Sequence, residues 1–190
     1  MLNKRDYVLI CISEEASEVI AEIINLIELD RSEFSKVKAF SPLFLKTPVF
    51  KNFVKENNDL IGCIKLAEEL GIIEFDANNE DIIKDRCDAL RSNAGLDLPD
   101  MVKVILHLQC TVSKLLRFGL NHVHPANKVK GKIVLKEACY DYLAWIWLFM
   151  EEYVDHSDIN FFDKKEIYAK MTKVSKYMKA ALEERIITRD

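Results

Sequence analysis

The chain has 190 residues, of which 49% are hydrophobic and 31% are charged, as is typical of a globular protein of one domain or of two small similar units. Its five glycines and four prolines fall well below the average usage of about 12%, which argues against a turn-rich β-sandwich or barrel and favours helices. The formal net charge of -4 argues against a strongly basic protein that binds nucleic acid.

The cysteines and the apolar segments bear on where the protein works. The five cysteines form no CxxC pair, so we expect buried free thiols in a reducing compartment. The apolar run near the amino terminus spans only residues 7–12, too short for the core of a signal peptide. The longest apolar run spans residues 142–150, whereas a membrane helix needs about 20 apolar residues. The sequence therefore predicts a cytoplasmic protein that has no membrane partner.

Three amphipathic helices are predicted in the first half of the chain. Apolar residues at steps of three and four predict helices over residues 7–29 and 51–70, and Gly71 ends the second of them. The polar stretch between these helices contains two prolines, which do not suit a helix interior. A third helix is predicted over residues 80–92.

The second half of the chain repeats this order of three helices. Pro99 is predicted to open a long helix that runs through Leu116, and Gly119 is predicted to end it. A polar loop then leads to a very apolar helix over residues 133–153, and a last helix is predicted over residues 164–185.

The two halves also resemble each other in sequence. Residues 59–64 align with residues 141–146, which matches an acid to an acid and a small residue to a small residue. We therefore predict an all-α helical bundle built from two similar three-helix units, residues 1–92 and residues 96–190, packed against each other as a pseudo-dimer within one chain. The sequence leaves open whether two such chains associate further.

Two acidic pairs stand on the first two predicted helices. Glu15 and Glu18 are three residues apart, as are Glu56 and Asp59, so each pair projects from one face of its helix, beside the apolar stripe. The four carboxylates can meet across a helix–helix interface, where their repulsion is unfavourable unless a cation compensates it. Because the donors are all oxygen atoms, the pattern favours Mg²⁺ or Mn²⁺. The alternative is a solvated acidic face, because ExxE and ExxD spacings are common in chains rich in glutamate.

With Glu14 in front of the first pair, the two motifs read EExxE and ExxD, and they resemble the marks of a known family. This family is the all-α nucleoside triphosphate pyrophosphatases, the MazG-like and dimeric dUTPase-like group. Residues 59–71 also look like that family. In the second half, residues 113–120 and 173–178 look like phage-type MazG-like proteins.

The resemblance implies an enzyme that hydrolyses a nucleoside or deoxynucleoside triphosphate to the monophosphate and pyrophosphate, with Mg²⁺ or Mn²⁺ as the cofactor. It implies that the metal ligands are Glu15, Glu18, Glu56 and Asp59. Glu14 is then a candidate base for the attacking water or a group that supports the ligands.

The second half departs from the family's pattern. The places of the three acids of the first helix fall on Lys103, Val104 and His107. Asp141 keeps its acid, but Glu137 lies four residues before it instead of three. We infer that the second half does not hold the same metal and that each chain has one catalytic site.

Two cations of the second half are candidates to bind the substrate's phosphates. Lys114 and Arg117 stand where the first half has Asn25 and Glu28, so only the second half carries positive charge at these places. The alternative role is that of a solvated helix end whose charge suits the helix dipole.

Two other classes of function compete with a pyrophosphatase. The first is a non-catalytic nucleotide binder, a sensor or sequestering protein on the same fold, since one half has lost its acids. The second is a structural helical interaction protein whose acids face solvent. A metal effect on stability together with turnover indicates the enzyme, a metal effect alone indicates the binder, and no metal effect indicates the structural protein.

Overall fold

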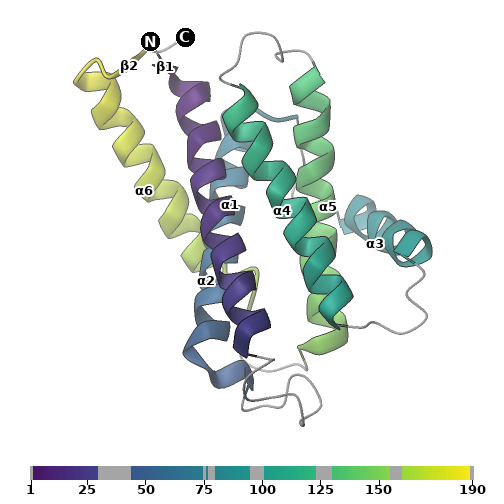
Figure 1. Ribbon diagram of the computed structural model, residues 1–190. Helices are drawn as coiled ribbons and strands as arrows, with labels where there is room; N and C mark the ends of the chain where they lie inside the picture. The colour runs from purple at the N-terminus through teal and green to yellow at the C-terminus, as the bar shows by residue number, and fades with distance from the viewer. Residues whose placement is uncertain are drawn as a thin grey trace.

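The computed structural model describes residues 2–29, 44–74, 76, 80–94, 101–122, 130–154 and 160–188, and it confirms an all-α fold (Figure 1). The described residues form six α-helices, one short 3₁₀ helix and two two-residue strands. Their bounds are β1 Leu2–Asn3, α1 Lys4–Leu29, η2 Phe44–Lys46, α2 Pro48–Glu69, α3 Glu80–Ala94, α4 Met101–His122, α5 Lys130–Tyr153, α6 Lys164–Glu183 and β2 Ile187–Thr188.

Side chains near the helix ends set several of these bounds. Thr47 caps α2 by accepting a hydrogen bond on Oγ1 from the amide of Phe50 at 3.2 Å, and Pro48 fills the first helical position. Asp163 caps α6 by accepting hydrogen bonds from two amides of its first turn. Gly71 follows α2 with a φ of 65°, in the left-handed conformation that glycine adopts without strain.

One predicted helix end is wrong. The helix predicted to stop before Gly119 continues through it to His122. Glycine in a helix interior costs only about 1 kcal/mol relative to alanine, and the packing of α4 against both α1 and α5 offsets such a cost. Pro99, which was expected to open this helix, lies outside the described residues.

The helices of the two halves interlock. α1 packs against α2 and α4, and α4 packs against α5. The third helix of each half lies on the second helix of the other half, because α6 packs on α2 and α3 packs on α5 (Figure 1). These pairings are compatible with two similar three-helix units, although α1 also contacts α6, and the pseudo-dimer stays a prediction.

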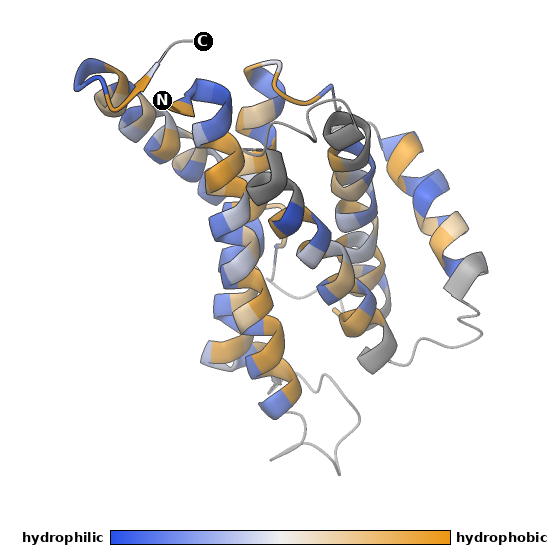
Figure 2. Ribbon diagram, turned by 45° about the horizontal axis from the view of Figure 1, so that its top comes forward, coloured by the Kyte–Doolittle hydropathy of each residue, from blue (hydrophilic) through white to orange (hydrophobic). Residues whose placement is uncertain are grey.

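The core runs between the helices and is rich in aliphatic and aromatic side chains. Four buried phenylalanines from α2, α5 and the turn before α6 gather with ring centroids 5.6 to 6.4 Å apart; they are Phe50, Phe53, Phe149 and Phe161. Figure 2 shows that each helix carries both hydrophobic and hydrophilic residues, as expected where only one face is buried. No helix in the described ranges has the length and apolar character needed to cross a bilayer.

The two ends of the described chain meet. Leu2 pairs with Ile187 and Asn3 with Thr188 in a parallel two-stranded ladder beside α1 and α6 (Figure 1). The sequence pattern predicts no strand here, because two residues are too few to show an alternation.

Candidate metal centre

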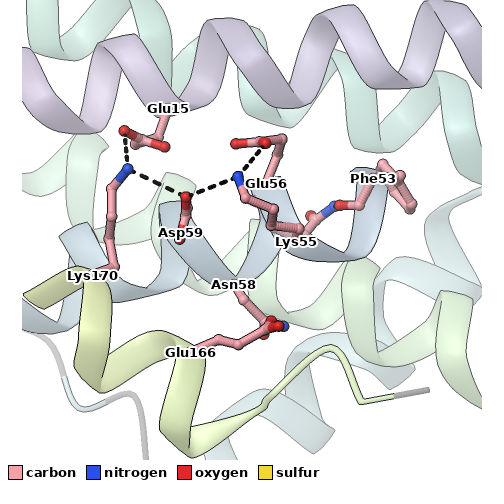
Figure 3. Close-up of polar contacts among 9 residues, drawn as sticks. Glu15, Phe53, Lys55, Glu56, Asn58, Asp59, Glu166 and Lys170 are labelled. Carbon is pink, nitrogen blue, oxygen red and sulfur yellow. Dashed lines mark hydrogen bonds and ion pairs between the residues drawn. The ribbon is translucent and has the colours of Figure 1, made fainter. Parts of the chain in front are cut away.

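Three of the four predicted metal ligands come together where α1 and α2 pack side by side. Glu15 points from α1 toward Glu56 and Asp59, which stand one turn apart on α2 (Figure 3). One carboxylate oxygen of each lies within 4.8 Å of those of the other two. This is the one such group of three or more candidate metal-ligating side chains within the described ranges.

Glu15 is the most deeply placed member of the group, with 5% of its surface exposed. Its Oε1 forms an ion pair with Lys170. Its Oε2 is buried and has no hydrogen-bond partner among the described residues, and the same is true of Oε2 of Glu56. Burial raises the pKa of Glu15, Lys170 opposes this shift, and the charges of Asp59 and Glu56 add to it. Buried carboxylate oxygens without a partner are costly, so these two atoms fit the ligation of a cation.

Glu18 lies one turn further along α1, and its side chain is exposed. Partial desolvation, the adjacent carboxyl group of Glu56 and the charge of Glu15 raise the pKa of Glu18 to about 7. Glu18 is therefore a neighbour of the three-carboxylate group, held close to Glu56. Glu14 is exposed on α1 and is not a member of the group.

Two lysines supply positive charge to these acids. Lys170 on α6 places its Nζ 2.5 Å from Oε1 of Glu15 and 3.3 Å from Oδ2 of Asp59 (Figure 3). Lys55 on α2 places its Nζ 2.6 Å from Glu56 and 3.4 Å from Asp59. Burial lowers the pKa of Lys170, but the hydrogen bond and charge of Glu15 and the charge of Asp59 outweigh it and leave that pKa above its usual value.

The sequence pattern was not used to assign a role to Lys170, although its position indicates a buried lysine. The residue lies on the apolar stripe of α6, after Ile167 and before Met171 and Val174, and all of these are buried. A buried lysine at such a position destabilises the fold unless an anionic partner compensates the free energy of removing its charge from water.

The predicted phosphate-binding cations stand on α4, which contributes none of the three carboxylates. Lys114 and Arg117 are exposed on α4, and neither forms an ion pair with the three carboxylates in the part of the chain that the structure describes. Lys114 instead lies close enough to Asp141 for its charge to oppose the raised pKa of that carboxyl group, which burial causes. The role of Lys114 and Arg117 in binding phosphate stays a prediction.

The equivalent place in the second half holds a different set of side chains. Arg86 of α3 pairs with Glu137 and, at 3.3 Å, with Asp141 on α5, as Lys170 of α6 pairs with Asp59 on α2. Val104 is 2% exposed, and the ring of His107 stacks on Trp145 with centroids 4.8 Å apart. Apolar and imidazole side chains thus fall on the places of Glu15 and Glu18, whereas Asp141 keeps its carboxylate beside a cation, as Asp59 does.

Two buried asparagines position α2 and the acids on either side of them. Asn58 donates to Oε2 of Glu166 at 2.7 Å and accepts a hydrogen bond from the amide of Asp163, which ties α2 to the start of α6. Asn57 accepts a hydrogen bond from the hydroxyl of Tyr142 at 2.6 Å, which ties α2 to α5. Sequence reasoning gave these two residues no role, and their position between Glu56 and Asp59 was the available signal.

A cavity of about 320 Å³ lies beside the acids, between α2 and the beginning of α6. Lys55, which pairs with Glu56 and Asp59, is also one of its lining residues, so the cavity and the acids are neighbours. Its lining combines two lysines with apolar and acidic groups: Phe50, Lys51, Val54, Lys55, Asn160, Asp163 and Glu166.

No protein-family model, curated protein or solved structure matches the chain. The MazG-like resemblance therefore stays a prediction from the motifs.

Proposed function

We propose that the protein is a divalent-metal-dependent pyrophosphohydrolase that converts a nucleoside or deoxynucleoside triphosphate to the monophosphate and pyrophosphate. One observation carries the proposal: a buried, unpartnered carboxylate oxygen of Glu15 beside Glu56 and Asp59, whose oxygen atoms lie within 4.8 Å of one another. All these donors are oxygen, which suits Mg²⁺ or Mn²⁺.

Each residue of the cluster has a task in this proposal. Glu15, Glu56 and Asp59 would hold the metal, and Glu18, next to Glu56, is the fourth candidate ligand. Mg²⁺ or Mn²⁺, when bound, supplies charge neutralisation at the phosphates and a more acidic water. Glu14 stays the candidate base for the water that attacks the α-phosphorus, while the bond from that phosphorus to the bridging oxygen breaks and pyrophosphate leaves.

The surroundings of the cluster support a phosphate-bearing substrate. Lys51 and Lys55 bring two ammonium groups to the adjacent cavity, which Asp163 and Glu166 also line, and its volume of about 320 Å³ lies at the lower end of the range usual for small-molecule sites. Lys114 and Arg117 are further candidates on α4. The proposed location is the cytoplasm, which agrees with five free cysteines.

The pseudo-dimer belongs to the same proposal. It is supported by the interlocked third helices and by the matched pairs of Lys170 with Asp59 and Arg86 with Asp141. In this interpretation the second half lacks the acids that Glu15 and Glu18 supply in the first half, so that one site per chain is active.

A panel of canonical and modified nucleoside triphosphates with Mg²⁺ tests the proposed reaction. Pyrophosphate should appear in equal amount with monophosphate, and inorganic phosphate should not. The same panel with Glu14→Gln tests the candidate base, because loss of turnover with metal binding retained is expected only if Glu14 acts on the water.

A non-catalytic nucleotide binder is the second candidate function. The observation that favours it is Lys170, which already compensates Glu15 and Asp59 from within the chain. Thermal stability measured with Mg²⁺, with and without each nucleotide, separates the two candidates: stabilisation without turnover identifies the binder.

A further inference from the structure

Lys170 is held among the carboxylates by the way α2 and α6 cross. A Cβ atom added to Gly62 of α2 would lie 2.9 Å from Cβ of Lys170 and 3.0 Å from the carbonyl oxygen of Ile167. The helices approach this closely because Gly62 has no side chain. The lysine stem is therefore fixed at the crossing, and only 8% of its side chain is exposed.

Its ammonium group contacts two of the carboxylates that a metal would need. Nζ lies 2.5 Å from Oε1 of Glu15 and 3.3 Å from Oδ2 of Asp59, so it already bonds to two of the three proposed ligands. Lys55 contacts the same Oδ2 of Asp59 at 3.4 Å, but its side chain is 57% exposed and is free to turn into solvent. Lys170 has no such freedom.

The charges of the cluster set up a competition between cations. When ionised, Glu15, Glu18, Glu56 and Asp59 carry four negative charges, and the ammonium groups of Lys55 and Lys170 already offset two of them. An ammonium group within hydrogen-bond distance of two ligands repels that ion strongly at a site with little water.

We propose that Lys170 is a built-in competitor of the divalent cation, which holds Glu15 and Asp59 in the metal-free protein and weakens metal binding. The inference rests on the proposed metal site and adds to it a residue that limits its affinity. Lys170, the cation that the second half brings to these acids, thus competes with the metal for Glu15 and Asp59.

Binding of Mn²⁺ to the full chain, measured by calorimetry and by electron paramagnetic resonance, tests this inference. Lys170→Met should bind Mn²⁺ about tenfold or more tightly than the parent chain, and its metal-free form should unfold at a lower temperature, because repulsion among the acids is then uncompensated. Lys170→Gln, which keeps a polar side chain able to donate to Glu15, is the second variant if Lys170→Met does not fold. Arg86→Met is the matched control: it removes the equivalent cation of the second half and should leave the affinity for Mn²⁺ unchanged.

The outcomes separate this inference from the proposed function. Tighter binding in the Lys170 variants alone supports the competitor, even if the parent chain binds Mn²⁺ too weakly to detect, in which case the proposed metal-dependent function fails. Parent and Lys170 variants of equal affinity overturn the competitor and leave the metal site standing. An equal gain in Arg86→Met also overturns it, because the effect would then come from total charge. Lack of binding in every variant overturns both.

Discussion

The hydroxyl group of Tyr142 donates a hydrogen bond to Oδ1 of Asn57 at 2.6 Å, and both side chains are fully buried. The bond joins α5 to α2 across 85 positions of the sequence. The side chain of Asn57, which lies between Glu56 and Asp59, is therefore held by a residue of the second half of the chain.

Tyr142→Phe should destabilise the whole protein by about 1–3 kcal/mol, because Oδ1 of Asn57 is then buried without its partner. Chemical unfolding followed by circular dichroism measures this loss. Tyr168→Phe is the control: Tyr168 is 70% exposed, so its change should stay within about 0.5 kcal/mol. A neutral effect of Tyr142→Phe would contradict a buried bond between the halves.

Gly62→Ala should separate α6 from α2. The added methyl group would meet Cβ of Lys170 and the backbone oxygen of Ile167, atoms that cannot move aside without shifting α6. Overpacking of this kind costs about 1–3 kcal/mol, which exceeds the helix-propensity gain of about 1 kcal/mol from replacing glycine by alanine.

Urea unfolding of Gly62→Ala measures the net loss of stability. Asn52→Ala, an exposed position on the same helix, is the control and should be neutral or slightly stabilising. If Gly62→Ala proves more stable than the parent chain, the two helices do not approach as closely as described.

The metal-free protein should lose stability as the pH rises from about 5 to 7.5. The pKa of Glu18 is raised to about 7 in the folded state from a reference value of 4.5, so the folded protein holds this proton more tightly than the unfolded chain. The stabilisation is fully present below the unfolded pKa and is lost as the pH passes through the folded pKa. The raised pKa of Glu15 acts in the same direction.

Thermal unfolding in a chelating buffer at pH 5.5 and at pH 7.5 measures this dependence. Glu18→Gln should reduce the fall in melting temperature, because the amide does not titrate. Glu28→Gln, an exposed change on the same helix, should keep the parental fall. Equal falls in all three proteins would show that Glu18 does not carry the effect.

The helices could be predicted because burial follows the 3.6-residue period of the sequence. The same period showed that Glu15 and Glu56 stand beside apolar stripes, and these two acids do meet in the structure. Lys170 could not be placed in the same way, since a lysine in an apolar stripe has an ion-pair partner that only the packing of α6 on α2 selects. Gly119 shows the converse, because local propensity predicted a helix end that tertiary packing overrides.

The pairing of Arg86 with Asp141 also depended on packing. Sequence reasoning identified Asp141 as an acid without its companions, but α3 belongs to the first half and comes before all three helices of the second half in the chain. Its contact with α5 exists only because the third helices cross between the halves.

Asp59→Asn and Asp141→Asn should differ strongly in turnover, because only Asp59 belongs to the three-carboxylate group. An asparagine side chain keeps the shape of the aspartate but lacks the charge that a metal needs, so kcat of Asp59→Asn should fall by about a hundredfold or more. Asp141 of α5 pairs with Arg86 of α3, so its replacement should affect stability more than turnover.

The measurement is the rate of pyrophosphate release from the best substrate, with circular dichroism to show that each variant folds. Comparable losses of kcat in the two variants would mean that both halves work as active sites. A fall confined to Asp141→Asn would move the catalytic site to α5 and α3.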